Sequence, residues 1–276
     1  VIMIIYGIMT DTSIAALFAA GVLPGIVATG FYIAAVRWTT WRNPQAAPKG
    51  ERLRWRDRFV ALRQIWQILG LFCAVLGGIY GGVFTPTEAA GIGAFGALVI
   101  AVARGGTSVA EFRKIFIEAA RTSAMIFAVL IGALIFANFI NFTSMSSDLA
   151  DLIDSHGISP LTVILMLVAV YIVLGCLFES ISMIVLTVPV FYPIVQGLDF
   201  DLVWFGILVV VVTEISLITP PVGMNVFVLR SFTPHIATGT IFRGLAPFVV
   251  VDFLRILLLV LVPGIALALP GALGLQ

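Results

Sequence analysis

The chain consists of long apolar stretches separated by short polar segments. Most of these stretches carry almost no charge and are long enough, as helices, to cross about 30 Å of hydrocarbon. They lack the alternation of apolar and polar residues that marks the strands of a membrane barrel. The pattern predicts an all-α polytopic membrane protein with apolar segments at 1–9, 14–36, 69–84, 89–103, 122–142, 160–178, 181–198, 202–230 and 245–269.

Composition agrees with a membrane protein, because 61% of the residues are hydrophobic and 11% are charged, whereas a soluble domain has about 25% charged residues. The net charge of +1 says nothing about partners, but 8 of the 15 Lys and Arg residues fall between Arg37 and Arg63. Basic residues beside membrane spans mark the cytoplasmic side. We therefore expect residues 37–65 to be a basic cytoplasmic connector, with an amphipathic helix at 51–67, and not a nucleic-acid-binding patch.

The distribution of charge also predicts a topology. Loops 37–65 and 104–121 are basic and should be cytoplasmic, whereas loops 143–159 and 199–201 contain aspartates and no Lys or Arg, so they should lie outside. Residues 160–198 then begin and end on the outer side. This arrangement predicts a re-entrant hairpin whose turn holds Glu179, Ser180 and Ser182.

The apolar segment 202–230 is interrupted at 219–223, in the sequence TPPVG. Two adjacent prolines remove backbone donors and clash with the preceding turn, and Gly223 permits backbone angles that other residues avoid. Irregular backbone at membrane depth is tolerated where it is buried in protein or lines a cavity. We therefore expect a broken helix with free carbonyl groups on one side and the positive N-terminal end of a half-helix on the other.

The hairpin turn and the break should lie at similar depth, since about 25 Å of helix leads from the outer side to each. A carboxylate, hydroxyls and free carbonyls suit a hard cation such as Na⁺, and a half-helix N-terminus suits a carboxylate substrate. The alternative is a proline kink that is packed for structural reasons alone.

Two further carboxylates lie in apolar surroundings, where a functional or paired role is the default. Thr85 and Pro86 favour a helix start at which Glu88 sits in the first turn, so a structural and a functional role remain equally open. Glu214 precedes the break by about one turn and has either a coupling or a structural role. Asp252 and Arg255 are spaced to pair with each other on one helix.

The sequence shows little sign of a reactive cysteine, a metal centre or an enzyme active site. Cys73 and Cys176 lie in apolar segments and are predicted to be small buried side chains. His156 and His235 stand in separate loops, so we expect neither a metal centre other than a Na⁺ site nor a cofactor. A Ser/His pair within the spans, an HExxH motif and paired aspartates are all missing from the sequence. An intramembrane enzyme is thus disfavoured, and an ungated channel or structural subunit is the remaining alternative to a transporter.

Residues 1–25 resemble residues 222–248, each with an apolar half-span, a polar loop, and a long span with an early proline. The predicted orientations of the two copies are opposite, which is typical of inverted-repeat secondary transporters. We therefore expect residues 1–36 to be the tail of a first repeat whose remainder lies upstream. Residues 66–276 would be the second repeat, with the hairpin at 160–198 and the broken helix at 202–230.

Three segments, GGVFTPTEAAG (81–91), LGCLFESISMIVLTVPVFYP (174–193) and EISLITPPVGMNVFVL (214–229), resemble signatures of the large membrane subunit of TRAP transporters, the tripartite ATP-independent periplasmic transporters. The resemblance covers essentially the whole chain. It implies an elevator-type fold like that of the ion-transporter superfamily, with a mobile domain that moves against a scaffold.

The same resemblance implies Na⁺-coupled import of an organic acid (a C4-dicarboxylate, 2-oxo acid or sialic acid) across a bacterial inner membrane. A periplasmic solute-binding protein and a small four-helix membrane subunit would be the partners. The alternative is another Na⁺- or H⁺-coupled anion symporter that works without a binding protein.

The resemblance also assigns site residues, although the hairpin position of Glu179 is often Asp in such proteins. It implies substrate binding by Asn225, Pro220 and Pro221. The implied Na⁺ site consists of Gly175, Glu179, Ser180, Ser182, Thr219 and Gly223.

Overall fold

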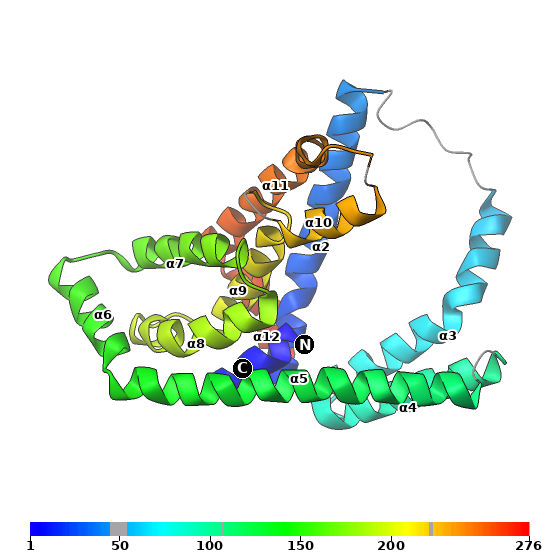
Figure 1. The fold of residues 1–276 in the computed structure, drawn as a ribbon, viewed down its shortest axis with the longest axis horizontal. Helices are drawn as coiled ribbons and strands as arrows, with labels where there is room; N and C mark the ends of the chain where they lie inside the picture. The colour runs from blue at the N-terminus through cyan, green and yellow to red at the C-terminus, as the bar shows by residue number, and fades with distance from the viewer. Residues whose placement is uncertain (45–53, 106–107, 221–222, 234, 276) are drawn as a thin grey trace. The chain divides into compact units, whose positions relative to one another are not determined.

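The computed structural model describes residues 1–44, 54–105, 108–220, 223–233 and 235–275. Within these ranges the regular secondary structure is entirely α-helical (Figure 1). The helices are α1 (Ile2–Thr10), α2 (Ile14–Arg42), α3 (Trp55–Tyr80), α4 (Pro86–Ala103), α5 (Val109–Phe142), α6 (Met145–Ser155), α7 (Pro160–Gly175), α8 (Ser180–Gly197), α9 (Leu202–Ser216), α10 (Met224–Phe232), α11 (Thr238–Leu261) and α12 (Gly264–Ala272).

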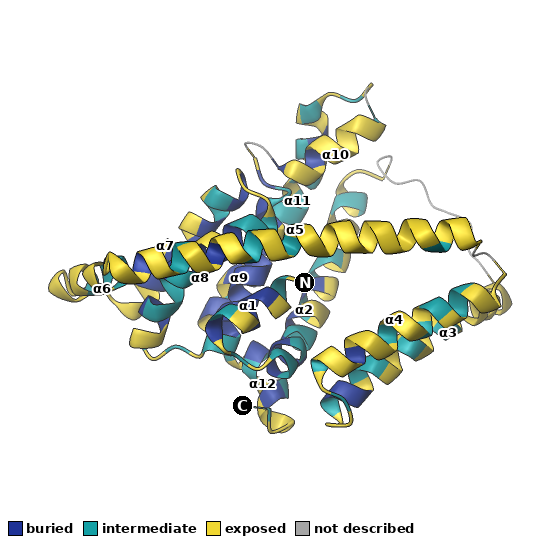
Figure 2. Cartoon of the chain, turned by 60° about the horizontal axis from the view of Figure 1, so that its bottom comes forward, coloured by how far each residue is buried: buried dark blue, intermediate teal, exposed yellow. Residues whose placement is uncertain are grey.

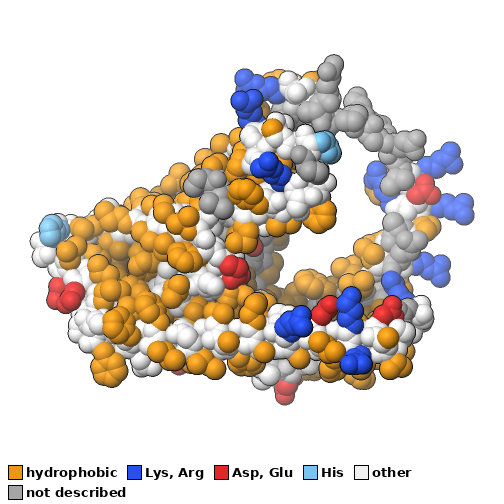
Figure 3. All heavy atoms as spheres, in the orientation of Figure 1, with side chains coloured by type: hydrophobic (Ala, Val, Ile, Leu, Met, Phe, Trp, Pro, Cys, Tyr) orange, Lys and Arg blue, Asp and Glu red, His pale blue; other side chains and the backbone are white. Residues whose placement is uncertain are grey.

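Several helices have the length and composition of membrane spans. Among the described residues, α2, α4, α5, α8 and α11 are long and apolar enough to cross a bilayer, whereas α7 and α9 are shorter apolar helices. Large hydrophobic side chains cover much of the visible surface (Figure 3); Phe72, Phe95, Phe127 and Ile135 are between 59% and 69% exposed. Such a surface is unfavourable in water and is suited to lipid, so the prediction of an all-α multi-pass membrane protein is confirmed.

The chain divides into two compact units. The first unit comprises Val1–Ala46 together with Val129–Gln276, and the second comprises Ala47–Ala128. The hairpin formed by α7 and α8 and the interruption between α9 and α10 both belong to the first unit. The second unit contains α3 and α4, which pack against each other, and the beginning of α5.

Helix α9 forms the centre of the first unit, where it contacts α1, α2, α7, α8, α11 and α12. All of its residues are buried except Leu202, Val203 and Glu214 (Figure 2). The hydrophobic effect does not drive helix association in lipid, so close packing and interhelical hydrogen bonds carry the stability.

Three contacts hold the N-terminal part of α9 in place. The Tyr6 hydroxyl donates to the Leu202 carbonyl at 2.7 Å, and the Trp204 indole donates to the Leu259 carbonyl at 2.8 Å. A methyl group at Gly206 would lie 2.5 Å from a ring carbon of Tyr6, so only glycine lets the two helices approach this closely. These contacts anchor α9 to α1 and α11, and the candidate site forms at the C-terminal end of α9.

The helix boundaries correct three sequence predictions. The amphipathic segment 51–67 and the apolar segment 69–84 are not separate, because α3 runs without interruption from Trp55 to Tyr80; residues 51–53 lie outside the described ranges. The predicted loop 104–121 is largely helical, since α5 begins at Val109. The predicted outer loop 143–159 contains α6. Charged residues suggested loops, but charge alone does not end a helix, and α3, α5 and α6 continue through their charged turns.

The cysteine prediction is half wrong. Cys176 is buried as expected, whereas Cys73 is exposed on the surface of α3. Apolar surroundings in the sequence do not distinguish a side chain that faces protein from one on a helix surface suited to lipid.

Candidate functional site

The hairpin has two helical arms and a short turn. Its first arm, α7, is capped by Ser159, whose hydroxyl accepts from the Thr162 amide at 3.3 Å. Helix α8 begins at Ser180 and is capped by the carboxylate of Glu179, which accepts from the amides of Ile181 and Ser182 at 3.0 and 3.2 Å. Helix α7 rises only about 24 Å, less than the hydrocarbon thickness. The arms and their caps therefore give the hairpin that the sequence predicted.

The broken helix is interrupted between Ser216 and Met224. Gly223 adopts a left-handed conformation with φ of 58° at the N-terminus of α10. The Asn225 amide donates to the Leu217 carbonyl at 3.1 Å, so the two halves remain joined across the break. Pro220 is exposed, while Pro221 lies outside the described residues.

The hairpin turn meets the break. A methyl group on Gly175 would overlap the Ser216 hydroxyl oxygen and lie 2.6 Å from the Ser216 Cβ. Helices α7 and α9 therefore contact each other at this point because residue 175 has no side chain. The Cys176 sulfur lies 3.7 Å from the Thr219 carbonyl oxygen and 3.6 Å from that of Pro220. The turn and the break are thus in direct contact, as expected if they lie at similar depth.

The polar side chains of this junction are mainly bonded within their own helices. The Thr219 hydroxyl donates to the Ile215 carbonyl at 2.7 Å, and the Ser216 hydroxyl to the Thr213 carbonyl at 2.6 Å. Glu179 is exposed and its hydrogen bonds go to Ile181 and Ser182 of its own arm. The direct contacts between hairpin and break thus come from Gly175 and Cys176.

The predicted site residues differ in accessibility. Gly175, Thr219 and Gly223 are buried, whereas Glu179 and Asn225 are exposed. Ser180 and Ser182 are partly buried. The junction therefore combines a buried backbone contact with an accessible carboxylate and the accessible first turn of α10. Oxygen ligands of this kind bind a hard cation, and the positive end of a helix dipole favours an anion.

A second polar cluster lies in the first unit, on α2, α9 and α11. The Tyr32 hydroxyl lies 2.8 Å from both carboxylate oxygens of Asp252, and Arg255 Nη2 lies 3.2 Å from Asp252 Oδ1. The predicted pairing of Asp252 with Arg255 is confirmed. Glu214 joins at its edge, with Oε2 3.9 Å from Arg255 Nη2. Its side chain is 60% exposed, against 6% for Arg255 and 2% for Asp252.

Glu88 has a local structural role. Its carboxylate accepts from the Thr85 amide and hydroxyl, each at 2.8 Å, while the Glu88 amide donates to the Thr85 hydroxyl at 3.3 Å. This reciprocal capping box starts α4 at Pro86. In the described ranges, no group of three or more His, Cys, Asp or Glu side chains is arranged to hold a metal ion.

Sequence reasoning missed three residues that shape these sites. Ser216 provides the surface that Gly175 contacts, and Cys176 contacts the broken backbone. Tyr32 binds Asp252 across 220 positions of sequence. For Tyr32 a signal existed, because a hydroxyl in an apolar span needs a partner. Ser216 and Cys176 carry no comparable signal, since either is ordinary in a packed helix.

An all-helical membrane protein in which a hairpin turn contacts a broken helix has the architecture of a secondary-transport permease. The family described as "Tripartite ATP-independent periplasmic transporter, DctM component" matches residues 1–265, and the chain belongs to this family. The family is one of transport proteins and not of enzymes.

Characterised relatives differ in the compounds for which they are named. The chain is 31% identical to the C4-dicarboxylate TRAP transporter large permease protein DctM of Pseudomonas aeruginosa, over 100% of this chain and 64% of the relative. It is 30% identical to the sialic acid TRAP transporter large permease protein SiaM of Vibrio cholerae, over 97% and 62%. It is 32% identical to the ectoine/5-hydroxyectoine TRAP transporter large permease protein UehC of Ruegeria pomeroyi, again over 97% and 62%. The chain thus spans a little under two thirds of the length of these relatives.

Proposed function

We propose that the chain is part of a Na⁺-coupled permease that imports an organic acid across a bacterial inner membrane. A periplasmic solute-binding protein would deliver the acid, and a small four-helix membrane subunit would accompany the permease. Membership of the TRAP family supports this proposal, as do relatives named for C4-dicarboxylates and sialic acid. The relative named for ectoine widens the substrate range beyond the three acid classes implied by the sequence motifs.

The observation that carries the proposal is the contact of the hairpin turn with the broken helix. The Cys176 sulfur reaches the Thr219 carbonyl at 3.7 Å, and Gly175 fits against Ser216. Irregular backbone held inside a membrane protein is otherwise costly. The junction places a hairpin carboxylate and the N-terminus of α10 in one structural unit, as joint binding of a cation and an anion requires.

In this proposal the Na⁺ ion takes oxygen ligands from both sides of the junction. Gly175, Thr219 and Gly223 would offer backbone or hydroxyl oxygens, and the hairpin would add a carboxylate and hydroxyls from Glu179, Ser180 and Ser182. The substrate carboxylate would bind at Pro220, Pro221 and Asn225, where the dipole of α10 favours negative charge. Glu214 would either take part in coupling at this site through Arg255 or have a structural role beside Arg255.

The internal repeat and the division into units support an elevator mechanism. Helices α1 and α10 each have 9 residues, and each precedes a long helix with an early proline, Pro24 or Pro247. Helices α2 and α11 pack against each other. The first unit contains the entire proposed site, so it would be the moving domain, and the second unit would belong to the scaffold.

The decisive experiment compares two carboxylates that cap helices in the same way. Glu179 caps α8, and Asp201 caps α9 by accepting from the amides of Val203 and Trp204 at 2.8 and 3.1 Å. Uptake by the complete transporter in proteoliposomes is measured against Na⁺ concentration for Glu179→Gln and Asp201→Asn. We expect the Na⁺ concentration for half-maximal uptake to rise at least about tenfold for Glu179→Gln alone, because a carboxylate ligand is lost.

Equal effects of the two substitutions would show that Glu179 acts only as a cap. Uptake that does not depend on Na⁺ would overturn the coupling, and uptake without the binding protein would favour the anion symporter that works alone. A thermal-shift screen of the binding protein against organic acids would identify the substrate class.

A further inference from the structure

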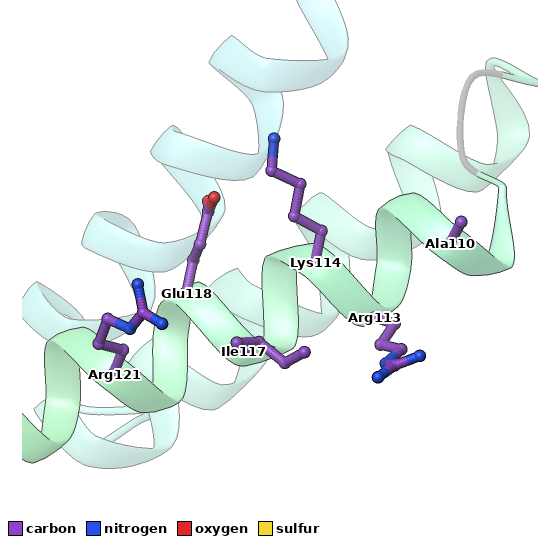
Figure 4. Close-up of a pocket in the computed structure, with 6 residues that line it drawn as sticks. All are labelled: Ala110, Arg113, Lys114, Ile117, Glu118 and Arg121. Carbon is purple, nitrogen blue, oxygen red and sulfur yellow. The ribbon is translucent and has the colours of Figure 1, made fainter.

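One face of the first turns of α5 is strongly basic. Its members recur at intervals of three and four residues, which places them on the same side of a helix. This α5 basic face consists of Ala110, Arg113, Lys114, Ile117, Glu118 and Arg121, which line an open hollow of about 350 Å³ (Figure 4). All six residues lie in the second unit.

The three cations of this face are not neutralised by the protein. In the described part of the chain, Arg113, Lys114 and Arg121 form no ion pair and no side-chain hydrogen bond. Glu111 is engaged elsewhere, because its carboxylate accepts from the Ser108 amide at 2.7 Å. The face therefore carries three positive charges against the single carboxylate of Glu118.

The opposite side of the same turns is apolar. The rings of Phe112 and Phe116 lie 4.8 Å apart, and Ile115 and Phe116 are 56% and 61% exposed. A helical segment with a basic face and an exposed apolar face is suited to the boundary between headgroups and acyl chains.

The sequence of α5 also fixes the depth of this segment. Residues 122–142 contain no charged side chain, and this length of helix spans about 31 Å, the thickness of the hydrocarbon core. The turns at 109–121 therefore lie at headgroup level. Their excess of Lys and Arg places them on the cytoplasmic side.

We propose that the α5 basic face binds the phosphate headgroup of an anionic phospholipid from the cytoplasmic leaflet. Lys114 and Arg121 are seven residues apart on the same side of α5, about 10 Å along its axis, so their long side chains can approach one phosphate from two directions. Arg113 adds a third cation at the edge. Ile117 and Ala110 form an apolar floor for the glycerol and the start of the acyl chains. Basic clusters directly cytoplasmic of a membrane span attract anionic lipids in this way.

The test measures binding of fluorescent phosphatidylglycerol to the full-length protein purified in uncharged detergent. In the variant R113Q/K114Q/R121Q we expect binding to weaken about 100-fold, from about fivefold for each cation removed. The control R54Q/R56Q/R63Q removes the same charge from exposed positions at the start of α3 that do not line the hollow. Binding of a headgroup held in the hollow should then weaken by less than the roughly fivefold that a single contacting cation contributes. R113K/R121K keeps the charge and should retain binding.

Glu118→Gln removes the one opposing charge and should tighten binding by up to about fivefold, which gives a readout that loss of folding cannot imitate. An equal loss in both triple variants would overturn the proposal, because the attraction would then be general to the basic surface. Equally tight binding of fluorescent phosphatidylcholine would overturn it too, as would displacement of the lipid by inorganic phosphate at millimolar concentration.

Discussion

Helix α9 contributes to two polar regions of opposite character. It reaches the junction through Ser216, and it reaches the cluster on α2 and α11 through Glu214. At the junction of the hairpin and the break, the hydroxyls of Ser216 and Thr219 donate to carbonyls of α9. The hairpin meets the break through Gly175 and through weak hydrogen bonds of the Cys176 thiol to backbone carbonyls. In the cluster of Tyr32, Asp252 and Arg255, the charged groups depend on partners from α2 and α11.

This difference has a mechanical meaning. Separation of the junction would break only the weak thiol bonds of Cys176 among its side-chain hydrogen bonds that are described, so movement there costs mainly packing. Opening the cluster would leave charges unpaired in low dielectric, which is far more costly. The cluster therefore fixes α2 to α11, and the junction is the contact that can rearrange at lower cost; in the proposed function, this is where a ligand would act.

The largest expected effect comes from breaking the cluster. Arg255→Leu leaves Asp252 as an uncompensated buried charge and should lower the free energy of unfolding by about 3–5 kcal/mol. The measurement is equilibrium unfolding in mixed micelles. The double variant Asp252→Leu with Arg255→Leu should recover most of this loss, since neither charge remains. A double variant as unstable as the single one would contradict this role of the cluster.

The next effect concerns close packing at the junction. Gly175→Val places a side chain where the Ser216 side chain lies and should lower the free energy of unfolding by about 1–3 kcal/mol. Adding Ser216→Gly removes the colliding group and should restore part of the stability. Unfolding measurements that show no rescue would mean that α7 and α9 do not meet at these residues.

A smaller effect on stability is expected when the Tyr32 hydroxyl is removed and the charges of Asp252 and Arg255 are kept. Tyr32→Phe keeps the ring, which packs 5.9 Å from that of Phe248, and removes the hydrogen bond to Asp252. Hydrogen bonds between membrane helices contribute about 0.6 kcal/mol on average, and a charged acceptor should raise this to about 1 kcal/mol. Tyr6→Phe, which loses a bond to a neutral carbonyl, is the matched control and should cost less.

The smallest effect on stability belongs to Glu214. Its carboxylate is 3.9 Å from Arg255 and its side chain is 60% exposed, so Glu214→Gln should change the free energy of unfolding by less than about 1 kcal/mol. The same variant should be assayed for Na⁺-dependent uptake. A loss of uptake without a loss of stability would assign Glu214 to coupling, whereas a large loss of stability would assign it a structural role in the cluster.

The position of the helix break could be predicted from the sequence, because prolines inside an apolar segment are a local and energetically costly feature. Pro220 and Gly223 located the break, and the helix-capping pattern located Thr85 and Glu88. The predictions failed where charge was read as a loop. Helix α5 continues through its charged turns because polar side chains at headgroup level do not break a helix.

The sequence by itself determined that this is a multi-pass helical membrane protein with a hairpin, a broken helix and a cluster of basic residues. Each of these features depends on local propensity, hydropathy or charge, which a linear reading can sum. Only the tertiary structure decided that Gly175 fits against Ser216 and that Tyr32 meets Asp252. It also showed that Glu179 caps its own helix. Such contacts depend on which faces of distant helices pack together, and several faces are equally apolar in sequence.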